Sequence, residues 1–363
     1  MKVKIGDLTN IKTGKLDANA SSEDGQYPFF TCSREALRIS TYSYDCECVL
    51  VAGNGDLNVK YYKGKFDAYQ RTYIIEDNGS GKLYIPYLYY FMEDYIDELR
   101  KQAIGGVIKY IKLGNIADAM IELPSIDNQK LIVDILGKVK EILDKRNAEI
   151  SALDALTKAR FVEMFGDPVV NPYGYDKVAL SELADIKIGP FGSLLHKEDY
   201  IEGGHPLLNP SHIVDGKISP DDRLTISDEK YEELSAYQLK IGDVVMGRRG
   251  EMGRCAVVPE DGLLCGTGSM LIRTKGKVTA DYIQKIISFP SFKKTIEDMA
   301  VGQTMPNLNV PIVSGFQIIK PPMEVQDRYY AFVDQVDKSK VAVQKALDET
   351  KLLFDSLMQK YFG

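Results

Sequence analysis

Two long segments of the chain carry apolar residues that recur every seven positions. In residues 124–166 the two series are Ile132, Val139, Arg146 and Leu153, and Leu136, Leu143, Ile150 and Thr157. In residues 322–363 they are Tyr329, Val336, Val343 and Thr350, and Val333, Lys340, Leu347 and Phe354. The positions between them are charged with both signs. This spacing predicts two long helices, each with an apolar seam of the kind found in coiled coils.

These two segments are copies of one another. A shift of 197 residues places Ala103 on Ala300, Gln129 on Gln326 and Phe165-Gly166 on Phe362-Gly363 without a gap. A helix with an apolar seam needs a partner in water, and the other copy is the simplest one. The residues expected to form the pairing contacts are Leu136, Val139, Leu143, Ile150, Leu153, Val333, Val336, Val343, Leu347 and Phe354.

The remaining residues form two globular parts with the same plan. In residues 1–123, short apolar runs such as Cys48–Val51 alternate with turn signals and predict strands, followed by a helix over Ile85–Lys101. In residues 167–321, Gly242–Gly250 matches Cys46–Gly55, and a helix is expected over Asp281–Met299. The segment Thr267–Ile272 aligns with the segment Tyr69–Ile74. We therefore predict an α+β fold with two similar mixed α/β domains in tandem (1–123 and 167–321), separated by two long helices (124–166 and 322–363).

Composition and charge narrow the functional classes. The chain has 363 residues, enough for about two or three domains. No apolar run approaches the length of a membrane span, and the first residues lack the apolar core of a signal peptide, so we expect a cytoplasmic protein without a membrane partner. The five cysteines are unevenly spread and do not indicate a disulfide framework. The formal net charge of −7 argues against nucleic-acid binding over the whole surface, but not against local basic patches.

Two glycine-rich turns lie among basic, aromatic and amide residues that suit contact with phosphates and base edges. Gly53–Asp56 and Gly247–Gly250 lack the Gly-Lys-Ser/Thr ending of a P-loop, and a purely structural role as hairpin turns stays open. In the first domain the candidate DNA-contacting residues are Lys12, Lys15, Arg34, Asn54, Asn58, Lys60, Tyr62, Lys63, Lys65, Gln70, Arg71 and Lys109. In the second domain they are Lys187, Ser193, Asn209, Ser211, His212, Arg248, Arg249, Arg254, Ser269, Gln303, Thr304, Asn307 and Asn309.

No catalytic constellation is visible in the sequence. Asn171–Gly174 approaches an adenine-methylating motif but lacks one of its prolines, and no strand runs into a glycine loop suited to S-adenosylmethionine. Cys46-Glu47-Cys48 has no second ligand pair, so no metal is expected. We therefore expect no catalytic residue, no cofactor and no small-molecule substrate.

The alternation of domain and helix, with its repetition, resembles the specificity subunits of type I restriction–modification enzymes. The matching patterns are Gly242–Val245 leading into the arginine-containing loop and Ala256–Val258, then Gly302–Leu308 and Pro321–Gln326. The first copy departs from the pattern, since Gly105–Tyr110 stands where the second has Gln-Thr-Met-Pro-Asn.

The resemblance implies a DNA-reading protein whose catalysis is carried out by partners. Each domain would read one half of a split sequence in double-stranded DNA, and the helices would pair antiparallel and set the spacing. Two methylation subunits would dock on the helix pair, and motor-nuclease subunits would cleave unmodified DNA. Two other classes stay open: a fused methyltransferase or nuclease with its own active site, and a coiled-coil scaffold that binds only protein.

Overall fold

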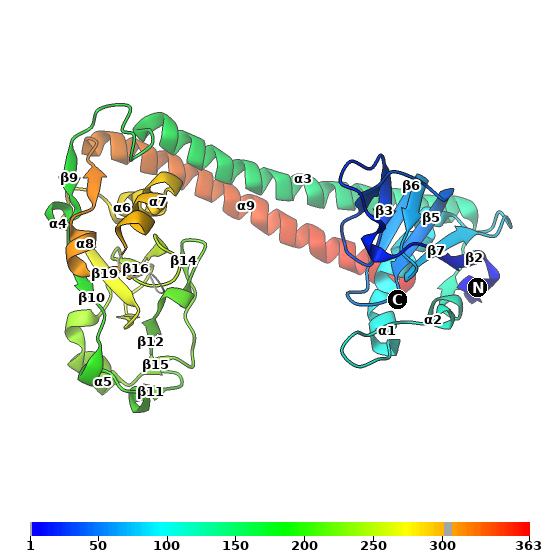
Figure 1. Ribbon diagram of the computed structural model, residues 1–363, viewed down its shortest axis with the longest axis horizontal. Coiled ribbons are helices and arrows are strands. Elements are labelled where there is room, and N and C mark those ends of the chain that lie inside the picture. The colour runs from blue at the N-terminus through cyan, green and yellow to red at the C-terminus, as the bar shows by residue number, and fades with distance from the viewer. Residues whose placement is uncertain (1, 301–306) are drawn as a thin grey trace. The chain divides into compact units, whose positions relative to one another are not determined.

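The computed structural model describes residues 2–300 and 307–363 (Figure 1). By its internal contacts the chain divides into two compact units. Unit 1 comprises Met1–Ser151 and Val341–Gly363, and unit 2 comprises Ala152–Lys340. Each unit therefore contains one globular part and part of both long helices, α3 (Ile126–Phe165) and α9 (Met323–Phe362).

Unit 1 is built on a six-stranded sheet. Its strands, in spatial order, are β2 (Thr9–Thr13), β7 (Thr72–Asp77), β5 (Tyr44–Ala52), β6 (Val59–Ala68), β3 (Tyr27–Phe30) and β4 (Leu37–Ile39). Neighbouring strands are antiparallel except for β3 and β6, which are parallel. The core lies between this sheet and α1 (Ile85–Gln102), whose apolar face buries Tyr87, Leu88 and Met92. Three further elements complete the unit: β1 (Lys2–Lys4), which pairs with β8 (Met120–Glu122), and α2 (Leu113–Ala117).

Unit 2 contains two four-stranded sheets and two small strand pairs. The first contains, in spatial order, β10 (Ala184–Ile188), β19 (Ser269–Thr274), β16 (Val244–Gly247) and β17 (Cys255–Val257). The second contains β11 (Tyr200–Ile201), β15 (Thr225–Ile226), β12 (His205–Leu208) and β18 (Leu264–Cys265). Two small pairs are β9 (Lys177–Ala179) with β20 (Gln317–Ile319), and β13 (Ile213–Val214) with β14 (Lys217–Ile218). The short helices are α4 (Leu180–Leu183), α5 (Asp228–Glu233), α6 (Ala280–Ile287), α7 (Pro290–Met299) and α8 (Val310–Ser314).

The two copies of the sequence repeat make equivalent hydrogen bonds at the start of the long helices. Gln129 and Gln326 are fully buried at equivalent positions of α3 and α9. The side-chain amide of Gln129 donates to the carbonyl of Pro124 at 2.9 Å, and that of Gln326 donates to the carbonyl of Pro321 at 3.0 Å. Buried polar groups are stable only when paired in this way, so the same glutamine fixes the start of each long helix.

The two long helices pair antiparallel, as predicted. In unit 1, Leu136 near the beginning of α3 shares a buried cluster with Met358 near the end of α9. In unit 2, Phe161 near the end of α3 packs edge-on against Tyr329 near the beginning of α9, with ring centroids 5.6 Å apart. The ten residues expected to form the seam are all buried or half-buried. This burial fits the seam expected from the heptad pattern, and the individual pairing contacts stay a prediction.

One ion pair crosses the helix pair in unit 2. Lys340 of α9 donates to a carboxylate oxygen of Asp154 of α3 at 2.6 Å. The lysine occupies a seam position of the heptad pattern. Polar residues at such positions fix the register of paired helices more than they add stability.

Two predictions of local structure were wrong. The helix expected over Asp281–Met299 is divided into α6 and α7, because Pro290 begins α7 and holds Phe289 in an extended conformation. The alignment of Thr267 with Tyr69 was displaced by one residue. Ser269 and Thr72 accept equivalent backbone hydrogen bonds, from Gly189 and Gly14 respectively, so these two residues are the true counterparts.

The predicted division at residues 123, 166 and 321 stays a prediction. The contact-based units instead divide each long helix, because each part packs on the globular part beside it. No helix in the described residues is long and apolar enough to cross a membrane.

Candidate nucleic-acid interface

In unit 2, the loop between β16 and β17 (residues 248–254) is held between two other segments. The backbone N–H of Arg248 donates to the carbonyl of Gly268 at 3.0 Å, and the carbonyl of Arg248 accepts from Leu308 N–H at 2.9 Å. Arg249 forms an isolated bridge with Asn307. The turn before β19 and the segment before α8 therefore fix the position of the two arginines.

The loop between β5 and β6 of unit 1 (residues 53–58) is held in the same way. The N–H of Gly53 donates to the carbonyl of Arg71 at 2.8 Å, and the carbonyl of Gly53 accepts from Ile111 N–H at 2.9 Å. Asn54 forms an isolated bridge with Tyr110, which is equivalent to the bridge between Arg249 and Asn307 in unit 2. The two units thus present Asn54 and Arg249 from one backbone construction.

In each unit a third segment contacts one of the two segments that hold the loop. These four segments together form the loop cluster of the unit. The N–H groups of Gly14 and Gly189 donate to the carbonyls of Thr72 and Ser269, at 3.0 and 3.1 Å. A Cβ atom at Gly189 would collide with the carbonyl of Gly266, so only glycine permits this approach. The exposed candidates Lys15 and Ser193 follow these glycines in sequence.

The arginines of unit 2 differ in environment. Arg248 is half-buried, and its Nε donates to Oδ1 of Asn307 at 3.1 Å. Burial, together with the adjacent Arg249, lowers the pKa of the Arg248 guanidinium from its usual value. Arg249 is exposed. Arg254 donates to the carbonyl of Pro210 at 3.2 Å and pairs with Glu251 at 2.7 Å. Arg249 is therefore the best placed of the three to contact a duplex.

Two candidates in unit 2 are buried, so their side chains do not face a duplex in this structure. His212 is 7% exposed, and its Nδ1 lies 3.0 Å from the carbonyl of Leu207. Ser269 is 0% exposed, and its hydroxyl has no hydrogen-bond partner among the described residues. Both polar side chains were selected from sequence for their chemistry, although they belong to the folded interior.

The other candidates of unit 2 have mixed surroundings. Ser193, Ser211 and Asn309 are exposed, Asn209 is half-buried, and Asn309 also caps α8 by accepting from Ile312 N–H at 2.9 Å. The exposed Lys187 lies over the ring of Tyr237. Gln303 and Thr304 lie outside the described residues.

In unit 1 several polar side chains hold the loops together. Asn58 donates to the carbonyl of Cys32 at 2.9 Å, and Lys60 donates to the carbonyl of Ser33 at 2.7 Å. Burial lowers the pKa of the Lys60 ammonium. These residues connect the β5–β6 loop and the start of β6 with the segment after β3, so they position the cluster.

The remaining candidates of unit 1 fall into three groups. Lys15, Gln70, Arg71 and Lys109 are exposed, and no side-chain ion pair involves them in the described residues. Lys12, Arg34, Lys63 and Lys65 are exposed but contact Glu76, Asp56, Glu47 and the ring of Tyr42, respectively. Tyr62 is half-buried, because its ring packs against Phe30 and Phe66.

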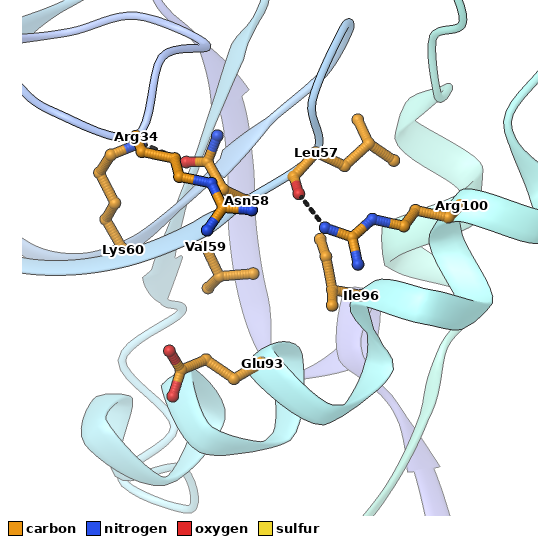
Figure 2. Close-up of a pocket in the computed structure, with 8 residues that line it drawn as sticks. All are labelled: Arg34, Leu57, Asn58, Val59, Lys60, Glu93, Ile96 and Arg100. Carbon is orange, nitrogen blue, oxygen red and sulfur yellow. Dashed lines mark hydrogen bonds between the residues drawn. The ribbon is translucent and has the colours of Figure 1, made fainter. Parts of the chain in front are cut away.

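Sequence reasoning missed Arg100, which lines a cavity of about 290 Å³ in unit 1 (Figure 2). Its guanidinium donates to the carbonyl of Leu57 at 3.0 Å and lies 3.6 Å from Asp56. Arg34, Asn58 and Lys60 also line this cavity. In the sequence Arg100 is simply a basic residue near a helix end, where it would stabilise the helix dipole, so nothing linked it to the loop.

The donor sets of the described residues do not suggest a metal site. No group of three or more histidine, cysteine, aspartate or glutamate side chains there could hold a metal ion. The Cys46 and Cys48 thiols lie in the sheet, and burial raises the pKa of both, to about 11 for Cys46.

Comparisons with known proteins agree on one family. A family model for the type I restriction modification DNA specificity domain matches residues 1–152 and again residues 172–350. The chain is 38% identical over 156 residues to the type I restriction enzyme EcoDI specificity subunit of Escherichia coli, a match that covers 43% of this chain and only 34% of that protein. It is 21% identical to the MjaVIII specificity subunit of Methanocaldococcus jannaschii, covering 95% of this chain and 89% of that one.

Solved structures show the same fold. The S subunit of a type I restriction-modification system from M. genitalium aligns over 100% of this chain and 96% of its own, with a TM-score of 0.62 and 16% identity. A chain from a structural study of type I system assembly and conformational transition aligns over 100% and 97%, with a TM-score of 0.64 and 17% identity. Because the family model covers most of the chain in two copies, the chain belongs to the family of type I restriction-modification DNA specificity proteins.

Proposed function

We propose that this chain is the DNA-recognition subunit of a type I restriction-modification complex, and that each unit reads one half of a two-part target. The observation that carries the proposal is the repeated loop construction. In both units the same backbone hydrogen bonds hold a loop whose side chains differ at equivalent positions, half-buried Asn54 in unit 1 and exposed Arg249 in unit 2. One construction with different side chains suits two readers with different base preferences.

The side chains available to each reader differ in charge and shape. Unit 2 offers the exposed guanidinium of Arg249, which can bond both acceptors of guanine in the major groove. Unit 1 offers the amide of Asn54 at the equivalent position, together with the exposed side chains of Gln70 and Arg71. Amides suit adenine, so the two halves of the target are expected to differ in sequence.

The long helices would set the spacing and receive the methylation subunits. Besides their buried seam, both helices carry exposed apolar side chains, namely Leu131, Ile142, Leu156, Val162, Val341, Leu352 and Leu353. Exposed apolar side chains mark a protein contact where they form a contiguous patch, so we expect those that lie together to make the docking surface. Methylation subunits that bind S-adenosylmethionine would dock here, and motor-nuclease subunits would join the complex they form.

The chain itself would act only as a targeting subunit. Mapping N6-methyladenine in cells that express the cognate methylation subunit, with and without this chain, tests the proposal. A two-part motif is expected only when the chain is present. The purified chain alone is expected to transfer no methyl group and to cut no DNA. Methyl transfer by the chain alone, or S-adenosylmethionine bound to it at a one-to-one ratio, would contradict the proposal.

A further inference from the structure

The two loops carry an acidic residue at the same position, which the sequence pattern did not mark as a candidate. Gly55 and Gly250 both have positive φ angles, of 70° and 79°, and turn the chain at the same point of the two loops. The next residue is Asp56 in unit 1 and Glu251 in unit 2. An acid so close to a DNA-reading loop would repel phosphate, so its presence in both units requires another role.

In each unit this carboxylate lies beside a basic residue of a helix that comes after the sheet in sequence. Asp56 lies 3.6 Å from the guanidinium of Arg100 at the end of α1, which also pairs with Asp97 of the same helix at 2.7 Å. Glu251 accepts from the ammonium of Lys293 in α7 at 2.9 Å. The helical partners differ in type and position, but both connect the loop to a helix.

In each unit the carboxylate also binds an arginine that lies in, or reaches, the segment after an earlier strand, β3 in unit 1 and β12 in unit 2. Asp56 pairs at 3.0 Å with Arg34, which lies in the segment after β3. Glu251 pairs at 2.7 Å with Arg254, which also donates to the carbonyl of Pro210 in the segment after β12. The loop, the helix and the second segment therefore meet at one carboxylate.

These contacts keep the carboxylates charged. Hydrogen bonds from Arg254 and Lys293 lower the pKa of Glu251 to about 2. The hydrogen bond from Arg34 likewise lowers the pKa of Asp56. Both carboxylates therefore stay ionised down to a lower pH than an unpaired acid would.

We propose that Asp56 and Glu251 are positioning residues, each of which ties the recognition loop of its unit to the following helix and so fixes the side chains that read one half of the target. This inference rests on the proposed function. It assigns Arg34, Arg254, Arg100 and Lys293 to these ion pairs, and removes Arg34 and Arg254 from the candidate DNA contacts. A displacement of a base-reading group by even a fraction of a hydrogen-bond length weakens discrimination, so a loose loop would read its half less strictly.

The test compares Glu251→Gln with Lys293→Met in the full chain assembled with its cognate methylation subunits. The probes are a duplex carrying the motif methylated by the wild type and duplexes with single base changes in either half. Both variants are expected to lose discrimination about tenfold in the half read by unit 2, while the other half is unchanged. Each variant removes one partner of the same ion pair. The double variant should therefore lose little more discrimination than either single variant.

The alternative is that Glu251 only offsets positive charge. In that case Glu251→Gln would strengthen binding to all duplexes and Lys293→Met would weaken it, with changes in the salt dependence of the affinity. That pair of opposite effects would overturn the inference, as would unchanged discrimination in both variants. Glu251→Asp should retain most of the discrimination.

Matched controls distinguish the loss of this ion pair from the general effect of removing a charge. Glu260→Gln removes the same charge from an exposed position of unit 2 that forms no ion pair within the described residues, and it should leave both halves intact. Asp56→Asn should affect only the half read by unit 1. If the wild-type complex prefers no duplex, the proposed function fails. If it reads a two-part motif that Glu251→Gln does not alter, only the inference fails.

Discussion

Arg248 and Arg249 are adjacent in the sequence but differ in what they can contact. The guanidinium of Arg248 is half-buried and bonded to Asn307, whereas that of Arg249 is exposed. Sequence alone marks both as candidate readers. The structure assigns Arg248 a part in holding the loop and leaves Arg249 available to DNA.

Arg249→Ala is therefore expected to relax the specificity of one half of the target only. A bidentate arginine contact contributes about 1–3 kcal/mol of discrimination, whereas a phosphate contact weakens all sequences alike and lowers the salt dependence. Methylation-site sequencing with the variant in the full complex measures the change. Degradation of both halves together, or of neither, would show that Arg249 does not read bases in one half. Changes at Asn58 or Lys60 should act on the other half.

The sequence indicated which residue types could form the candidate site, but not how the fold arranges them. The two glycine turns were found because glycine, arginine and amide residues cluster there in the sequence. Burial was not predictable for His212 or Ser269, since polar residues give no signal of entering a core. Arg100 and Lys293 were missed because they reach the loops only through folding, from helices distant in sequence.

At the scale of elements, the heptad pattern was the strongest signal. Each seam residue expected from it is buried or half-buried, and both helices begin within two residues of the predicted start. The helix predicted from Asp281 continued beyond the end of α6 at Ile287, because the pattern treated Phe289-Pro290 as part of one continuous helix. Apolar spacing reports which face of a helix is buried, but not where a proline forces a new helix to begin.

Substitutions in α9 test the seam. Leu347 is 2% exposed and Leu352 is 70% exposed, although both are leucines of the same helix. We expect Leu347→Ala to lower the free energy of unfolding by about 2–5 kcal/mol. Leu352→Ala should change it by no more than about 0.5 kcal/mol. Chemical denaturation of the two variants gives both values, and equal losses would contradict the assigned seam. Charged residues at Val139 and Leu143 should separate the helices altogether.

At the scale of the whole molecule, the repeat explains how one chain can carry two readers. The buried glutamines Gln129 and Gln326 make equivalent hydrogen bonds at the start of the two long helices. The loop clusters also share their backbone contacts. Because each loop is held within its own unit, side chains can differ between the copies without altering the frame that holds them.

The same repeat creates a risk of wrong pairing, and we expect the ion pair between Lys340 and Asp154 to counter it. By the 197-residue shift, Lys340 corresponds to Leu143 and Asp154 corresponds to Lys351. If α3 paired with α3 of another molecule in the same register, Asp154 would face Leu143. Two α9 helices would place Lys340 against Lys351. Only α3 with α9 brings the opposite charges together.

Replacing both Asp154 and Lys340 with leucine should therefore increase self-association, measured by sedimentation across a range of concentrations. A matched variant, Asp334→Leu with Lys338→Leu, removes an ion pair from the exposed side of α9 and adds the same two leucines. Equal association of the two variants would mean that exposed apolar surface alone is responsible. A gain confined to the first would show that this single pair keeps a duplicated helix from oligomerising with its own copies, so that the chain closes on itself.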